Sequence, residues 1–281
     1  MKRFEEALHA GYSQGFDVTN VLFHEKTEHQ DLVIFETPSF GRVMALDDIV
    51  QVTSRDEYVY HEMMTHVPLL AKGDATDVLI IGGGDGGILR EVLRHKSVEN
   101  ATMVEIDRAV VDLCLEYFPD ISNGAFDDPR SELIITDGVK FVAETDRRFD
   151  AIIVDSTDPI GPGEVLFTER FYAHCHRCLK DGGVLVTQNG VPFFQGEEVT
   201  NTYRRMGKSF ADNGFYTAVV PTYVGGFMTL GWGTDDAALC DVDLDVLRTR
   251  FADADIKTRY YTPELHKAAF ALPQFILDLM N

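Results

Sequence analysis

The pattern of hydrophobic and polar positions changes near residue 60. Before that point, apolar residues occur in short runs or alternate with polar ones, in DLVIFE, GRVMALD and IVQVT. The turn-forming residues TPSFG and Asp47-Asp48 separate these runs. From Asn20 to Thr53 the chain therefore predicts an antiparallel meander of strands, a region of about 50 residues that is small for an independent domain. We expect it to pack on the rest of the chain or on a second copy of itself.

From about this point on, helical and strand-like patterns alternate. The helical segment RDEYVYHEMMTHVPLL comes first, with Pro68 near its end. Five strand-like runs follow, each with a helical segment behind it: DVLII, TMVEID, LIITD, AIIVD and GVLVTQ. This alternation predicts βαβ units and a mostly parallel sheet covered by helices. The last two strand-like runs, FYTAVVPTY and GGFMTLGWGT, predict an antiparallel pair.

Together these patterns predict an α/β fold, in which a doubly wound sheet is preceded by a small antiparallel β domain. We place the boundary so that residues 1–57 form the N-terminal β domain and residues 58–281 form the α/β domain. In doubly wound sheets, ligands bind at the carboxyl ends of the strands. We therefore look for a site at that edge of the sheet.

The chain is strongly acidic, with 46 Asp and Glu residues against 25 Lys and Arg and a formal net charge of −21. Its basic residues are scattered, so the surface is expected to repel nucleic acid and anionic membranes. Such a surface suits cationic ligands, with solubility alone as the alternative explanation. No apolar run is as long as a membrane span or a signal peptide. Four cysteines are too few for a disulfide scaffold of this size, and we predict a cytoplasmic protein.

Acidic residues follow four of the predicted strands. Asp85 lies in the loop after VLII, Glu105 ends TMVE, Asp137 ends LIITD, and Asp155 ends AIIVD with Asp158 three residues later. A single Asp in such a place is often a turn residue or a helix cap. If the strands are parallel and adjacent, however, all of these carboxylates line one edge. That arrangement favours a functional site over a purely structural role.

The loop GGGDGG lies between a predicted strand and a predicted helix. Gly82, Gly84 and Gly87 match the pattern G-x-G-x-x-G, and Glu105, 18 residues after Gly87, is well placed to accept hydrogen bonds from ribose hydroxyls. A nucleoside ligand is therefore indicated. A pyrophosphate against this loop would face the carboxylate of Asp85, which is unfavourable. The loop instead suits a sulfonium ligand of the S-adenosylmethionine type, which carries no phosphate.

The same acid bears on the form of this ligand. Ordinary S-adenosylmethionine has a carboxylate and an ammonium at its amino-acid end, whereas the decarboxylated form keeps only the ammonium. Asp85 would attract the ammonium and repel the carboxylate, so it favours the decarboxylated form. Asp137 and Gly138 together suit the adenine amino group, as an acidic acceptor beside a backbone donor.

The motifs GGGDGG, VEID, DG and DSTDPIGP together resemble those of the spermidine synthases, the polyamine aminopropyltransferases. Other segments, such as HEKTEHQDLVIF and YYTPELHKAAFALPQF, resemble the bacterial members, so the resemblance covers essentially the whole chain. It implies an N-terminal β domain followed by a Rossmann-like, methyltransferase-type catalytic domain, in a homodimer or homotetramer. It also implies transfer of an aminopropyl group from decarboxylated S-adenosylmethionine to putrescine, giving spermidine and methylthioadenosine.

The resemblance also implies roles for individual residues. Asp155 is the proton acceptor, and Asp85 contacts the aminopropyl amine. The other residues that line the polyamine site are His61, Asp158, Tyr60, Tyr223, Gln51 and Gln188. The residues that contact the nucleoside are Gln30, Glu105, Asp137, Gly138 and Pro162. Residues 156–168 resemble the gating loop of the family.

The expected reaction needs a base. At neutral pH both ends of putrescine are ammonium groups, which have no lone pair and cannot attack carbon. One end must lose a proton, and Asp155 can accept it when burial raises the pKa of the acid and lowers that of the amine. No metal and no cofactor are expected, because decarboxylated S-adenosylmethionine is a co-substrate.

Several alternatives stay open at this point. A polyamine N-methyltransferase that uses ordinary S-adenosylmethionine would have to hold the carboxylate that Asp85 disfavours. A silent binding protein would not need Asp155 beside the reacting carbon. The choice among putrescine, cadaverine, agmatine and spermidine depends on pocket depth. The CxxC of Cys175 and Cys178 is interpreted as two thiols on a helix, not as a zinc or redox site.

Overall fold

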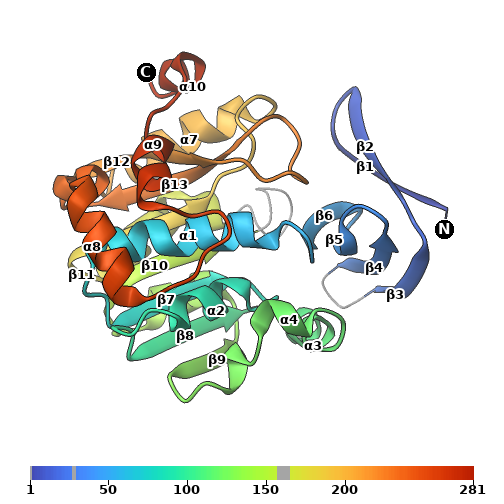
Figure 1. Ribbon diagram of the computed structural model, residues 1–281. Helices are drawn as coiled ribbons and strands as arrows, with labels where there is room; N and C mark the ends of the chain where they lie inside the picture. The colour runs from blue at the N-terminus through green and yellow to red at the C-terminus, as the bar shows by residue number, and fades with distance from the viewer. Residues whose placement is uncertain (1, 27–29, 157–164) are drawn as a thin grey trace.

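The computed structural model describes residues 2–26, 30–156 and 165–281. In this part of the chain the strands form sheets of two, four and seven strands. Figure 1 shows the two smaller sheets on one side of the molecule and the large sheet with its helices on the other. A small β region followed by an α/β region is the predicted fold class, and it is confirmed.

The N-terminal region is antiparallel throughout. A hairpin of β1 (Arg3–His9) and β2 (Tyr12–Asp17) precedes the four-stranded sheet. That sheet follows chain order, with β3 (Asn20–Lys26), β4 (Asp31–Thr37), β5 (Gly41–Leu46) and β6 (Ile49–Thr53). The predicted meander is therefore confirmed. The β1–β2 hairpin was not predicted, because charged neighbours obscure the buried pair Phe4 and Phe16 in the sequence pattern.

The large sheet has the strand order β12-β13-β11-β10-β7-β8-β9. Its strands are β7 (Asp77–Gly82), β8 (Asn100–Glu105), β9 (Ser131–Ile135), β10 (Phe149–Asp155), β11 (Leu179–Gln188), β12 (Asp212–Ala218) and β13 (Met228–Thr234). All neighbours are parallel except that β13 runs antiparallel to both β11 and β12. The parallel βαβ part and the antiparallel pair at the end of the chain are both as predicted.

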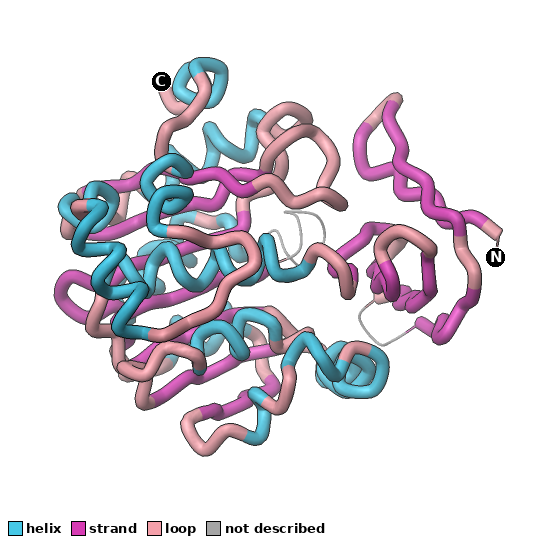
Figure 2. Tube along the Cα trace, viewed as in Figure 1, coloured by secondary structure: helices cyan, strands magenta, loops and turns pink. Residues whose placement is uncertain are grey.

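Helices cover both faces of this sheet, as Figure 2 shows. They are α1 (Glu57–Lys72), α2 (Gly87–Leu93), α3 (Arg108–Tyr117), α4 (Pro119–Ser122), α5 (Gly138–Glu144), α6 (Glu169–Cys178), α7 (Gly196–Met206), α8 (Leu244–Ala254), α9 (Pro263–Ala269) and α10 (Gln274–Leu279). Short 3-10 turns lie at η1 (Ala125–Asp127) and η3 (Ala237–Asp241). Among the described residues, no helix is long and apolar enough to cross a membrane.

Two cores follow from the alternation of side chains along buried strands. On β7, Ile80 packs into the core that contains α1 and α2, whereas Ile81 packs into the core that contains α5 and α6. A strand covered on both faces needs apolar residues at every position, which explains the unbroken run VLII. Cys175 and Cys178 are buried in the second core as free thiols, as interpreted from the sequence.

Helix α1 connects the two parts of the molecule. It begins directly after β6, and all of its residues from Val59 to Ala71 are buried. Pro68 does not end it; the helix continues to Lys72 and is capped by Gly73 in a left-handed conformation. The four-stranded sheet rests on α3, where Leu32 and Met44 pack against Val110. The boundary between residues 57 and 58 stays a prediction.

Candidate active site

The site lies where β7 and β10 end side by side. Gly82 at the end of β7 pairs with Asp155 at the end of β10, and the chain leaves these two strands toward opposite sides of the sheet. Such a switch point is the usual ligand site of a doubly wound sheet. A cavity of about 350 Å³ opens there. The predicted site residues that line it are Gln30, Gln51, Tyr60, His61, Gly82, Gly84, Asp85, Glu105, Asp137, Gly138, Asp155, Gln188 and Tyr223.

The glycine loop after β7 leaves no room for side chains at several of its positions, Gly82 and Gly87 among them. Gly82 has φ of 82°, and a Cβ atom there would lie 1.9 Å from the carbonyl oxygen of Asp155. A Cβ on Gly87 would lie 2.2 Å from the His61 ring. The Asp85 Oδ1 accepts a hydrogen bond of 2.8 Å from the backbone N–H of Gly87. This hydrogen bond joins two residues within the loop, and Asp85 also lines the cavity.

Asp155 lies in surroundings that oppose its negative charge. Burial, together with the nearby charge of Asp85, raises the pKa of its carboxyl group to about 7. The hydroxyl group of Tyr60 donates a hydrogen bond of 2.7 Å to Asp155 Oδ1 and works against this rise. The ring of Tyr60 is in edge contact with that of Tyr223, 6.0 Å away. Asp155 is therefore an oriented carboxyl group that exchanges a proton near neutral pH.

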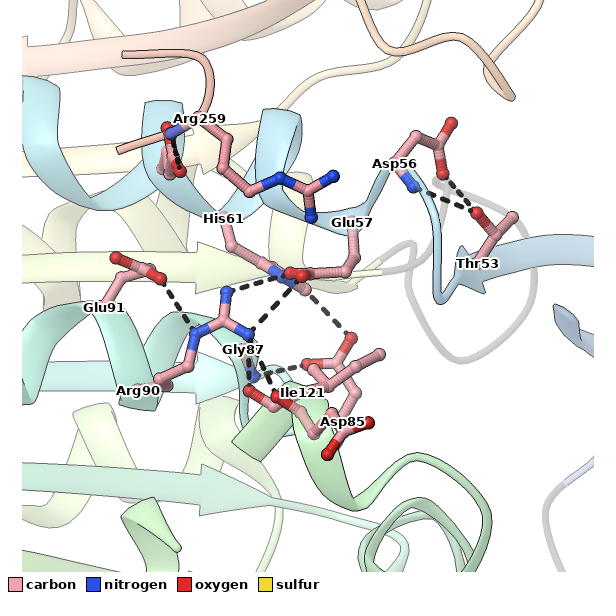
Figure 3. A network of polar contacts seen from close by, with 12 residues as sticks. Thr53, Asp56, Glu57, His61, Asp85, Gly87, Arg90, Glu91, Ile121 and Arg259 are labelled. Carbon is pink, nitrogen blue, oxygen red and sulfur yellow. Dashed lines mark hydrogen bonds and ion pairs between the residues drawn. The ribbon is translucent and has the colours of Figure 1, made fainter. Parts of the chain in front are cut away.

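His61 lies between two carboxylates (Figure 3). Its Nδ1 is 2.6 Å from Glu57 Oε2, and its Nε2 is 3.2 Å from Asp85 Oδ2. Burial alone would lower the pKa of the imidazole, but the two carboxylates raise it to about 10. In return, the imidazolium keeps the pKa of Asp85 below its ordinary value despite burial. At neutral pH, therefore, the imidazole of His61 is positively charged and the carboxylate of Asp85 is negatively charged.

A second group of acids lines the cavity at the ends of β8 and β9. Burial raises the pKa of Glu105, although its Oε1 accepts a backbone hydrogen bond of 2.9 Å from Asp107. Gln30, from the N-terminal region, reaches across to donate to Asp107 Oδ2 at 3.3 Å. Asp137 caps α5 by accepting from the N–H of Val139 at 2.7 Å. The ordinary role of an Asp as a helix cap thus applies to Asp137, which lines the cavity as well.

The sequence analysis missed residues on the opposite wall. Glu6, from β1, and Asp56, at the start of α1, are buried and line the cavity. Asp56 Oδ2 accepts from the N–H and the hydroxyl group of Thr222, at 2.9 and 2.7 Å. The next residue, Tyr223, donates from its hydroxyl group to the carbonyl of Gln51 at 2.5 Å. No local signal predicts these contacts, because they join segments more than 160 residues apart.

Two of the predicted site residues, Asp158 and Pro162, lie outside the described residues, as does most of the predicted gating loop 156–168. Within the described part of the chain, no group of three or more His, Cys, Asp or Glu side chains could hold a metal ion. The individual roles assigned to the residues of this site stay predictions.

Comparison with family models matches both parts of the chain. Residues 57–244 match the spermine/spermidine synthase domain, and residues 4–54 match the spermidine synthase tetramerisation domain.

Individual proteins agree with these models. The chain is 60% identical to polyamine aminopropyltransferase 1 of Pseudomonas aeruginosa, covering 100% of this chain and 98% of that protein. It is 57% identical to the polyamine aminopropyltransferase of Escherichia fergusonii, covering 99% and 97%. Among solved structures, a spermidine synthase in complex with the transition state analogue AdoDATO has a TM-score of 0.93 and 36% identity, covering 99% and 94%. The spermidine synthase of Thermotoga maritima has a TM-score of 0.90 and 35% identity, covering 99% and 93%.

Proposed function

The chain belongs to the spermine/spermidine synthase family and is a polyamine aminopropyltransferase, and from this premise we propose its substrates and its base. It transfers an aminopropyl group from decarboxylated S-adenosylmethionine to putrescine, with Asp155 as the general base. One observation carries the proposal: Asp155, whose pKa is raised to about 7, lines the same cavity as the acidic loop residue Asp85.

The donor is argued from charge. Decarboxylated S-adenosylmethionine carries a sulfonium and an ammonium, and three acids line the cavity around the glycine loop: Asp85, Glu105 and Asp155. Asp85 is fully charged at neutral pH, so it attracts the ammonium. A carboxylate on the donor would face the same acid at a cost, which supports the decarboxylated form. Glu105 is proposed to accept the ribose hydroxyls, with Asp137 and Gly138 beside the adenine.

The reaction balances with one proton transferred. An ammonium end of putrescine gives its proton to Asp155, and the freed nitrogen attacks the carbon next to the sulfonium. The new C–N bond forms as the C–S bond breaks, and the bonding electrons return to sulfur. The products are spermidine and neutral methylthioadenosine. A base with a pKa of about 7 is a much better match for an amine than an ordinary aspartate, whose value is 3.8.

We also propose an assembly and a location for the enzyme. The match of residues 4–54 to a tetramerisation domain supports a homo-oligomer, and we propose a homodimer or a homotetramer. No metal and no cofactor enter the proposed reaction. The cytoplasm remains the location expected from the composition.

A paired assay tests the function. The purified protein is incubated with putrescine and either decarboxylated or ordinary S-adenosylmethionine, and the products are identified by mass. Spermidine and methylthioadenosine in the first reaction alone are the expected result. Methylputrescine in the second reaction would instead indicate a polyamine N-methyltransferase. The variant Asp155→Asn should bind the donor as the wild type does but lose at least about a hundredfold in turnover; unchanged turnover would exclude Asp155 as the base.

A further inference from the structure

A row of charged side chains begins at the cavity with Asp85 and ends at Arg90, which lines a second cavity of about 800 Å³; Glu57 lines both cavities. Along this row the groups alternate in sign: the carboxylate of Asp85, the imidazolium of His61, the carboxylate of Glu57 and the guanidinium of Arg90 (Figure 3). Their side chains are only 11, 3, 9 and 16% exposed, in that order. Charges that are this well buried interact strongly, and removing one of them leaves its partners uncompensated.

Glu57 is the central contact of this row. Its Oε2 lies 2.6 Å from His61 Nδ1 and 2.9 Å from Arg90 Nη2. Arg90 is held in turn by Glu91, at 2.8 Å from its Nε, and by the carbonyl of Ile121, at 2.7 Å from its Nη1. Arg90 is therefore held by three partners. It in turn holds the carboxylate of Glu57, which holds the imidazole of His61.

The other side of His61 contacts the glycine loop. Its Nε2 lies 3.2 Å from Asp85 Oδ2, while Asp85 Oδ1 accepts from the N–H of Gly87. The His61 ring also packs closely against Gly87, where a Cβ atom would lie 2.2 Å from the ring. Each carboxylate oxygen has two lone pairs. Asp85 can therefore keep both of these contacts and still accept a hydrogen bond from a ligand in the cavity.

We propose that Glu57 and Arg90 are positioning residues for the donor, which hold His61 and thereby fix the Asp85 carboxylate for the ammonium of the aminopropyl group. This inference rests on the donor proposed above. It assigns a role to two residues that the resemblance to the family did not include. Neither acts on the reacting atoms; both act through His61.

Glu57→Gln tests the inference by calorimetric titration with two ligands. Decarboxylated S-adenosylmethionine has the ammonium, and methylthioadenosine lacks it. The substitution keeps the size of the side chain but removes one negative charge from the row, and with it the charged hydrogen bonds to His61 and Arg90. The loss of a charged hydrogen bond should weaken donor binding about tenfold or more and leave the affinity for methylthioadenosine within about twofold.

Two arginine variants separate positioning from simple electrostatics. Arg90→Gln removes a positive charge, so charge alone predicts tighter binding of the cationic donor, whereas loss of positioning predicts weaker binding. We expect weaker binding. Arg94→Gln is the matched control, because Arg94 bonds to Glu91 at 2.7 Å, close to Arg90 along the chain, and has no bond to Glu57 among the described contacts. Its donor affinity should equal that of the wild type.

The inference is overturned if Glu57→Gln binds the donor as the wild type does, or if it loses both ligands equally, since equal loss means general damage to the site. Tighter donor binding by Arg90→Gln overturns it as well. If the wild type binds neither ligand, the proposed function fails and this inference fails with it. Failure of the variants alone leaves the proposed function unaffected.

Discussion

At the scale of single residues, Asp155 shows how the site opposes the stability of the fold. The pKa of its carboxyl group is raised to about 7 from an ordinary value of 3.8, chiefly by burial. Between these two values the unfolded chain has lost the proton and the folded chain keeps it. The contribution of Asp155 to the free energy of unfolding is therefore fully present below pH about 4. It falls as the pH rises from about 4 and is lost above about 7. A base that is useful near neutral pH is thus a source of instability there.

Asp155→Asn should stabilise the protein in a way that depends on pH. The amide is neutral at every pH and can still accept the hydrogen bond from Tyr60. The melting temperature of the variant should exceed that of the wild type clearly at pH 8 and much less at pH 5, because the destabilisation of the wild type builds up between pH about 4 and about 7 and is complete only above about 7. Thermal unfolding at both values measures this. An equal difference at pH 5 and pH 8 would mean that the Asp155 charge is not responsible.

At the scale of elements, the strands that form the site could be read from the sequence, but their partners could not. The unbroken run VLII predicts a strand covered on both faces, and a glycine loop behind it predicts the turn into α2. Asp85, Glu105 and Asp155 follow from those positions, because parallel strands end at one edge. Glu57 is four residues before His61 on a predicted helix, which places the two on one face. That spacing alone does not reveal that Asp85 lies beyond His61.

The residues that were missed depend on contacts distant in sequence. Asp56 is held in the wall of the cavity by a hydrogen bond from Thr222, 166 residues further along the chain. Glu6 reaches the cavity because it lies on β1 of the β1–β2 hairpin, whose sequence pattern was too weak to predict. Hydrophobic periodicity reports which face of an element is buried, and it does not report which element covers that face.

Asp56→Asn should loosen the wall of the cavity that Tyr223 belongs to. Asp56 accepts three hydrogen bonds, from the hydroxyl group of Thr53 at 2.5 Å and from the N–H and hydroxyl group of Thr222. An amide has a single acceptor oxygen, so one partner is left facing an N–H group. We expect a loss of about 1–3 kcal/mol in the free energy of unfolding and a higher KM for putrescine.

The matched control for this prediction is Asp243→Asn. Asp243 is an exposed cap that accepts a single backbone hydrogen bond from Asp245. Asn caps a helix about as well as Asp, so a change within about 0.5 kcal/mol is expected. Chemical denaturation measures both variants. Equal effects of the two substitutions would contradict the role of Asp56.

At the scale of the whole molecule, charge is the dominant property. The chain has 46 acidic and 25 basic side chains, while both proposed substrates are dications. A negative surface attracts such ligands over distances set by the screening length, about 30 Å at 0.01 M salt and about 8 Å at 0.15 M. The attraction raises the local concentration of the substrates before any specific contact is made.

Raising the ionic strength should therefore lower kcat/KM for putrescine several-fold, with little change in kcat, because screening weakens the encounter between enzyme and substrate but not the chemistry of the bound complex. The measurement is a steady-state assay at 0.01 and 0.3 M sodium chloride. Binding of neutral methylthioadenosine serves as the control and should not change. Light scattering at both concentrations shows whether the oligomer stays intact. If kcat/KM is independent of salt while the oligomer is intact, the net charge of −21 serves solubility and not substrate capture, since attraction over such distances cannot escape screening.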